Sequence, residues 1–310
     1  MADVSMQQVK ELRDRTQAGL NDCKSALVEA AGDMEKAVEV ILKKGLAKSA
    51  KRAGAIATEG VVTALVAKDG KSGVLVEVNI QTDFAARNTE FLDFASKVAT
   101  AALAAKAGAD LGAEKVPGGS ATIEETRQAL VGKLGENITV RRWDRLNVDG
   151  SGKVHAYVHL GGKVGVILAA RTGNQAAAGA ASFEKFVDDS AMQIAAMAPL
   201  YVSSSEVPAD AKEKQSAIFA SQLAEEGKPE AARPKIIEGK LAKWMKEVCL
   251  LEQDSVIESD KTVEQLRAGL AKELGGEITL SRFARFQLGE GIEKPTAPDF
   301  AAEVAKMAGG

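Results

Sequence analysis

The sequence contains few of the side chains that most often carry catalysis, metal binding or cross-linking. It has two cysteines, Cys23 and Cys249, and two histidines, His155 and His159. Two cysteines are too few for a disulfide framework, so a reducing compartment is expected. The histidines are four residues apart on a predicted strand, roughly 13 Å from each other. That separation excludes one tetrahedral metal ion bound by both.

Long apolar runs, strong net charge and phosphate-binding motifs are also absent. No apolar run approaches the ~18 residues of a membrane span, and the segment around Asp3 lacks the apolar core of a signal peptide. The formal net charge of −3 gives no attraction to nucleic acid or to anionic membranes. Gly161-Gly162-Lys163-Val164 lacks the Ser or Thr of a phosphate-binding loop. We therefore expect a cytoplasmic protein without metal or cofactor, and with neither nucleic acid nor membrane as a partner.

Residues 1–54 predict a three-helix bundle with a basic linker. Ser5 and Gln8 have the spacing of a capping box, and Asp33 is expected to cap the third helix. Gly45 is expected to end that helix. Five basic residues follow between positions 43 and 52, and they form either a patch for an acidic partner or a solvated helix end.

The remainder predicts a duplicated α+β core. Gly73-Val74-Leu75-Val76 recurs 92 residues later as Gly165-Val166-Ile167-Leu168, and Leu134-Gly135 recurs 140 residues later as Leu274-Gly275. The difference between these offsets leaves 48 additional residues in the second copy. Because these residues have helical patterns around a Gly-Lys-Pro break, an inserted antiparallel hairpin is expected.

The expected fold is thus α+β, with an N-terminal bundle, two antiparallel sheets with helices, the hairpin and a C-terminal helix. Strands are predicted over 61–66, 74–80 and 138–143 in the first copy, with helices beginning after Asn88 and Thr122. The predicted units cover 1–54, 55–147, 148–288 with the hairpin over about 203–250, and a C-terminal arm over 289–310.

Residues 79–88 connect a strong predicted strand to the next helix. Asp83 and Phe84 stand at the tip of this connection, where function is often located, and an aromatic side chain there can anchor another protein. The alternative is that Asp83 caps a helix and Phe84 belongs to the core. In the second copy the pair becomes Gln175 and Ala176, which favours a role of Phe84 outside its own core.

Several separated segments resemble the elongation factor Ts family. They are Leu12 to Lys24, Thr82-Asp83-Phe84-Ala85-Ala86-Arg87-Asn88, Leu134-Gly135-Glu136-Asn137-Ile138, and Gly289 to Lys294. Ala85 stands where that family usually has Val. The resemblance extends from about residue 5 to 308. It implies a ubiquitin-associated-like bundle at the N-terminus, a helical hairpin in the insertion and a C-terminal module that contacts a partner.

The resemblance further implies a guanine-nucleotide exchange factor for elongation factor Tu that performs no covalent chemistry. In that family the aromatic of the motif wedges between helices of the GTPase, and the neighbouring carboxylate perturbs the groups that hold Mg²⁺. The contact segment transfers to Thr82, Asp83, Phe84 and Ala85. Supporting contacts transfer to Arg13, Arg87, Asn88 and His159.

Two other classes of function stay open at this point. The bundle could belong to a ubiquitin-associated-like adaptor without exchange activity. Alternatively, Asp83 and Glu77 could serve an enzyme, which would need a concave pocket and a further acid or base. For the oligomeric state, a homodimer and a heterotetramer with elongation factor Tu both stay open.

Overall fold

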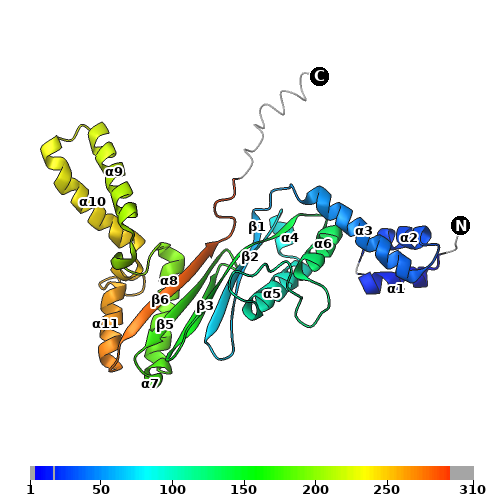
Figure 1. Ribbon diagram of the computed structural model, residues 1–310, viewed down its shortest axis with the longest axis horizontal. Coiled ribbons are helices and arrows are strands. Elements are labelled where there is room, and N and C mark those ends of the chain that lie inside the picture. Colours follow the sequence, from blue (N-terminus) through cyan, green and yellow to red (C-terminus); the bar gives the residue numbers. More distant parts are fainter. Residues whose placement is uncertain (1–3, 17, 294–310) are drawn as a thin grey trace.

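A computed structural model describes residues 4–16 and 18–293 and has the expected α+β fold (Figure 1). Helices at the N-terminus are followed by two three-stranded antiparallel sheets with helices packed on them. The N-terminal helices lie at one end of an elongated molecule, and a helical hairpin stands away from the sheets near the other end (Figure 1). The boundaries between the predicted units stay predictions.

The N-terminal bundle consists of α1 (Met6–Thr16), α2 (Leu20–Glu29) and α3 (Met34–Arg52). Its small core consists of apolar side chains spaced on one face of each helix, among them Val9, Leu12, Cys23, Leu27 and Ala37. The predicted capping residues act as expected. The amide of Gln8 donates to Ser5 Oγ, and the amide of Lys36 donates to the carboxylate of Asp33.

Contrary to the prediction, α3 does not end at Gly45 and continues to Arg52. Gly45 instead lies where α3 crosses α6 (Ile123–Leu134), opposite Gly132. A Cβ at Gly132 would lie 2.9 Å from the Cα of Gly45, so this glycine pair permits close approach of the two helix backbones. Packing against α6 therefore overrides the local tendency of a glycine to end a helix.

The basic residues of the expected linker consequently lie on α3. Lys44 forms an ion pair with Glu29 at 2.8 Å, and Lys48 forms one with Asp22 at 2.9 Å. These partners come from α2, within the same bundle. The pairs support the interpretation of this run as a solvated helix end.

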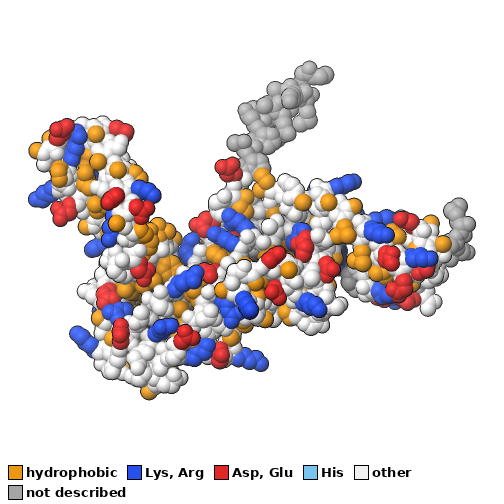
Figure 2. Space-filling view, in the orientation of Figure 1, with side chains coloured by type: hydrophobic (Ala, Val, Ile, Leu, Met, Phe, Trp, Pro, Cys, Tyr) orange, Lys and Arg blue, Asp and Glu red, His pale blue; other side chains and the backbone are white. Residues whose placement is uncertain are grey.

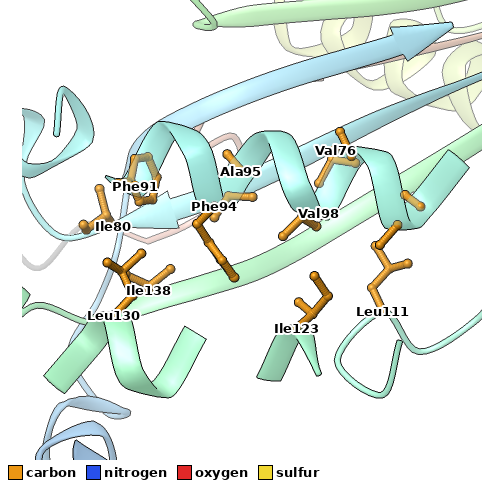
Figure 3. Packing of buried hydrophobic residues seen from close by; sticks show 14 of the residues in the cluster. Val76, Ile80, Phe91, Phe94, Ala95, Val98, Leu111, Ile123, Leu130 and Ile138 are labelled. Carbon is orange, nitrogen blue, oxygen red and sulfur yellow. The ribbon is translucent and has the colours of Figure 1, made fainter. Parts of the chain in front are cut away.

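The first sheet has the strand order β1-β2-β3, formed by β1 (Glu59–Val66), β2 (Ser72–Ile80) and β3 (Ile138–Asn147). Its helices are α4 (Asp83–Ala86), α5 (Thr89–Ala104) and α6. In Figure 3, Phe91, Phe94 and Val98 of α5 pack with Ile80 and Ile138 of the strands. The helix predicted after Asn88 is therefore α5, and these side chains form its core-facing side.

The second sheet repeats this arrangement with the order β4-β5-β6, formed by β4 (Gly152–His159), β5 (Val164–Thr172) and β6 (Ile278–Gln287). Helices α7 (Gln175–Ala178), α8 (Ala181–Met197) and α11 (Val263–Glu273) correspond to α4, α5 and α6. Each central strand also has a register shift, between Glu77 and Val78 in β2 and between Ala169 and Ala170 in β5. These positions are 92 residues apart, which agrees with the duplication inferred from the sequence.

The two sheets pack on each other through their second faces. Val62, Leu75, Leu146, Ile167 and Ala169 are buried there in one apolar cluster. Because β2 is covered on both faces, almost every residue of this strand is buried. The central strand of the first sheet is thus a rigid support for whatever follows it.

The inserted residues form the predicted hairpin from α9 (Ala209–Glu225) and α10 (Arg233–Val248). Short 3-10 turns, η1 (Ser204–Glu206), η2 (Glu230–Ala232) and η3 (Leu250–Glu252), stand at its base and tip. Leu223 is the one buried residue of these two helices. The hairpin therefore projects from the core with most of its surface uncovered (Figure 1).

The predicted C-terminal helix, with its start near Pro298 or Asp299, lies outside the described residues. None of the helices in the described part of the chain is both long enough and apolar enough to cross a membrane. On the face shown in Figure 2, positive and negative side chains are interspersed over the described residues, in keeping with the small net charge.

Candidate functional site

The candidate segment, Thr82 to Asn88, begins at the end of the central strand β2. Ile80 is fully buried and pairs with Glu59 of β1 on one side and with Ile138 of β3 on the other. The chain thus leaves the sheet from a position fixed on both sides. Two residues later it turns into α4, a helix of only four residues.

Two successive side-chain caps shape this segment. Thr82 is the N-cap of α4, and its Oγ1 accepts from the amide of Ala85 at 3.2 Å. Asn88 is the N-cap of α5, and its Oδ1 accepts from the amide of Glu90 at 2.8 Å. Ala85 is buried against the first sheet, so a methyl group secures the underside of α4.

Phe84 projects from α4 into solvent with 86% of its surface exposed. It is the most exposed large apolar side chain of the described residues. The alternative in which Phe84 belongs to the core is therefore wrong. The alternative role of Asp83 as the cap is also wrong, because Thr82 occupies that position and Asp83 is the first helical residue.

Asp83 and Arg87 form an ion pair across one turn, with 3.3 Å between Oδ2 and Nη2. Both side chains are largely exposed, so this pair adds little to folding stability. Asp83 and Phe84 are adjacent in α4, and both are exposed. The single helical turn therefore presents a carboxylate and an aromatic ring to solvent.

Glu136, in the turn before β3, holds this segment from the other side. One of its carboxylate oxygens accepts from the amide of Thr82 at 3.0 Å, and the other accepts from the Thr82 hydroxyl at 2.7 Å. Next to it, Gln81 Oε1 accepts from the amide of Asn137 at 2.7 Å. Asn137 is buried and donates in turn to the carbonyl of Ala55. We call Gln81, Thr82, Glu136 and Asn137 the brace.

The remaining predicted contact residues lie on other units of the molecule. Arg13 is exposed on α1 of the bundle. His159 ends β4 of the second sheet, where its Nδ1 lies 2.8 Å from the Tyr157 hydroxyl and the two rings stack. The segment 82–88, Arg13 and His159 therefore form no common pocket, and a partner contacting all three would have to be large.

Glu77 is fully buried and occupied by intramolecular partners. Its carboxylate accepts from Arg141, Arg142, Asn79 and the amide of Gly289. Burial alone would raise the pKa of Glu77, but the hydrogen bonds from Gly289 and these side chains outweigh burial and lower the pKa below its ordinary value. A carboxylate in this state is a poor proton acceptor, which disfavours the enzyme alternative.

Within the part of the chain that the structure describes, the His and Cys side chains have structural surroundings. Among residues 4–16 and 18–293, no group of three or more His, Cys, Asp or Glu side chains is placed to hold a metal ion. His155 instead contacts Asp188, with 2.9 Å between Nε2 and Oδ1. Cys23 and Cys249 are both buried and free, and burial raises the pKa of the Cys249 thiol to about 11.

A groove of about 670 Å³ lies between α3 and α6. Its walls include Val38, Ile41, Leu42 and Ala129, and Lys44 and Lys48 at its side are in the ion pairs described above. These side chains offer apolar contact surface, and they supply no acid and base arranged for catalysis.

Comparison with known proteins identifies the family. A family model described as Elongation factor TS matches residues 81–290. This chain belongs to the elongation factor Ts family. The matched span begins at Gln81 and includes the segment 82–88, Glu136, the hairpin and the end of β6. Three curated relatives named Elongation factor Ts support the assignment across the rest of the chain.

These relatives come from bacteria of three different genera. The protein of Clostridium perfringens (strain SM101 / Type A) is 45% identical over 310 residues, covering 99% of each chain. That of a Nitratiruptor species is 45% identical over 304 residues, covering 97% of this chain and 98% of its own. That of Trichlorobacter lovleyi is 43% identical over 309 residues, covering 99% of each. The elongation factor Ts assignment therefore includes the N-terminal bundle and the C-terminal arm.

Glu136 and Gln81 were not predicted as site residues. The sequence nevertheless contains a signal for Glu136, because the alignment of the two copies makes Gly276 its equivalent in the second copy. A side chain present in one copy and missing from the other points to a local task. In this elongation factor Ts chain the copy with Glu136 is also the copy with the exposed ring.

Proposed function

We propose that this chain binds elongation factor Tu, in its GDP-bound and nucleotide-free forms, and accelerates release of GDP in the cytoplasm without covalent chemistry. The observation that carries the proposal is the exposure of Phe84 on a capped single-turn helix at the end of a buried strand. An uncovered phenyl ring is unfavourable in water. A partner surface that covers it would convert this exposure into binding free energy.

In the proposed mechanism the ring of Phe84 enters the GTPase between helices near its Mg²⁺ site. Asp83 would then perturb the groups that hold the ion, and displacement of the ion would promote release of GDP. Thr82 and Ala85 complete the contact segment, while Arg87 and Asn88 maintain its shape. Membership in the elongation factor Ts family and the exposed position of Phe84 support this proposal.

The energetic requirement shows why Phe84 needs help from other contacts. A factor that prefers the nucleotide-free GTPase weakens nucleotide binding by the same coupling free energy. A thousandfold acceleration would require roughly 4 kcal/mol, since each 1.4 kcal/mol gives a factor of ten. Burial of one Phe contributes about 1.5–3 kcal/mol. The rest would come from distant contacts, for which Arg13, His159 and the projecting hairpin are the candidates.

The direct test is release of labelled GDP from elongation factor Tu by the Phe84→Ala variant. We expect release about tenfold to a hundredfold slower than with the wild type, the effect of losing one buried ring. Ile257→Ala serves as a matched control, because Ile257 is also a large exposed side chain but lies in the turn before α11. An unchanged rate for Phe84→Ala would refute the proposed wedge.

A further inference from the structure

The position of the tip of α4 is not determined by its own packing. A helix of four residues is far below the length at which helices are stable alone. Its largest side chain, Phe84, contacts solvent, and Ala85 is its one buried residue. The methyl group of Ala85 and the partly buried Ala86 that follows it give limited control over the direction of the ring. The orientation of α4 must therefore be set mainly by its cap and by whatever holds that cap.

Glu136 holds the cap through both of its carboxylate oxygens. The Thr82 hydroxyl donates its proton to Glu136 at 2.7 Å, so its lone pairs are left to accept from the amide of Ala85 at 3.2 Å. The amide of Thr82 donates to the second oxygen at 3.0 Å. A carboxylate acceptor makes such hydrogen bonds stronger than neutral acceptors do. Glu136 thereby fixes both the backbone of Thr82 and the rotamer of the capping hydroxyl.

The support of Glu136 is itself rigid. The neighbouring residue Asn137 is buried and bonded to Gln81 and to the carbonyl of Ala55, and Ile138 begins β3 in register with Ile80. The brace therefore links three separate pieces of backbone around the start of α4.

The second copy closes the same fold without this carboxylate. There α7 is capped by Asn174, whose Oδ1 accepts from the amide of Ala177 at 2.8 Å. The position of Glu136 is taken by Gly276, where a Cβ would lie 3.2 Å from the Asn174 side chain. Gln175 and Ala176 stand in place of the acidic and aromatic residues. The fold therefore does not require this carboxylate. The carboxylate occurs in the copy that presents the exposed ring of Phe84.

We infer that Glu136 is a positioning residue for exchange, which acts through Thr82 to hold Phe84 and Asp83 in the orientation that enters the GTPase. This inference rests on the proposed function. Its role differs from that of Phe84, because Glu136 does not need to touch the partner. Its loss should leave binding largely intact and reduce the rate at which the bound GTPase loses GDP.

The first test uses the free chain, so it does not depend on the proposed function. Hydrogen exchange of the Ala85 and Ala86 amides reports the order of α4, since both donate to Thr82. In Glu136→Ala we expect these amides to exchange roughly fivefold faster than in the wild type. Glu125→Gln is the matched control. Glu125 also accepts from a threonine amide at a helix start, but it belongs to the capping box of α6. Equal protection in Glu136→Ala and wild type overturns the inference.

The second test measures GDP release from elongation factor Tu over a range of concentrations of this chain. For Glu136→Ala we expect the maximal rate to fall roughly fivefold, with the half-saturating concentration within about twofold of wild type. Glu136→Gln keeps the side-chain volume and one acceptor oxygen. Its maximal rate should therefore lie between those of Glu136→Ala and the wild type. Glu136→Gln also replaces Glu136→Ala if that variant does not fold. A loss confined to the half-saturating concentration contradicts a positioning role.

A double-variant cycle tests whether Glu136 acts through Thr82. Thr82→Ala removes the hydroxyl but keeps the backbone amide that donates to Glu136. Adding Glu136→Ala should therefore lower the maximal rate by a smaller factor than Glu136→Ala does in the wild-type chain. Independent, multiplying losses overturn the inference. If Phe84→Ala leaves release unchanged, the proposed wedge fails, while the amide exchange of Ala85 still decides whether Glu136 orders the tip.

Discussion

The amide of Gly289 donates a 2.8 Å hydrogen bond to the buried carboxylate of Glu77, although 212 residues separate them. The same carboxylate accepts from Arg141 and Arg142 of β3, and both arginines also donate to Glu290, which follows β6. Glu77 thus joins the first sheet to the point where the C-terminal arm leaves the second sheet. The counterpart of Glu77 in the second copy is Ala169, so the junction occurs once.

This junction predicts an acid-sensitive contribution to stability. Because the pKa of Glu77 is lower in the folded chain than its ordinary value of 4.5, the contribution is present above about pH 4.5 and is lost as pH falls through the lower folded pKa. We expect Glu77→Gln to be less stable than wild type by about 2–3 kcal/mol near neutral pH. Urea unfolding at a series of pH values should show this difference shrinking as the pH falls below about 4.5. A difference that stays constant across the series would contradict the prediction.

The contact between α3 and α6 predicts opposite effects for two helical glycines. In Gly132→Ala the new methyl group would lie 2.9 Å from the Cα of Gly45, and we expect a loss of about 1–2 kcal/mol in the docking of the bundle. In Gly269→Ala, where nothing lies within 4 Å of the new Cβ, better helix propensity should stabilise α11 by about 0.5–1 kcal/mol. Amide exchange in each helix measures both effects. Equal behaviour of the two variants would show that the close approach is unimportant.

The comparison of the two copies also predicts that an exposed ring promotes GDP release only from the first copy. Ala176 of α7 is exposed at the position equivalent to Phe84, so Ala176→Phe should fold with a stability within about 0.5 kcal/mol of wild type. Combined with Phe84→Ala, it should leave GDP release from elongation factor Tu as slow as Phe84→Ala alone. Recovery of the rate in the double variant would mean that any exposed ring on this scaffold suffices.

Thiol reactivity provides a prediction away from the site. Burial raises the pKa of Cys249 to about 11, and the thiolate is the reactive form. At about pH 8, Ellman's reagent should therefore react with Cys249 only when the chain opens locally or unfolds. Urea should accelerate the reaction in parallel with loss of the folded state. Rapid labelling of Cys249 in the folded chain would contradict its burial at the base of the hairpin.

Much of this architecture could be predicted from local patterns. The duplication, the strands, the caps at Asp33, Asn88 and Thr122, and the hairpin follow from periodicity and from residue types with one dominant use. The contact between Gly45 and Gly132 could not be predicted, because whether a glycine ends a helix or permits a close crossing depends on a helix almost ninety positions away in the chain. The same limit applies to the buried ion pairs of Glu77.

For the candidate segment, the sequence indicated where the ring stands but could not decide its direction. A Phe beside a helix start is compatible with core packing and with exposure, and only the three-dimensional structure places it in solvent. Thr82 was predicted as part of the contact surface, whereas in the structure it is also the cap of α4. Its hydroxyl is engaged on both sides, by Glu136 and by Ala85.

Because α3 continues through its crossing with α6, it fixes the rotational orientation of the N-terminal bundle relative to α6. One face of this helix packs on α1 and α2, and a later turn docks at Gly45. Each residue of an α-helix adds about 100° of rotation and 1.5 Å of rise. Inserting or deleting one residue between Ile41 and Gly45 would therefore swing the whole bundle to a different side of the molecule. Such a segment should tolerate point substitutions far more readily than changes in its length. The number of residues in it sets both the distance and the rotation between the bundle and the sheets.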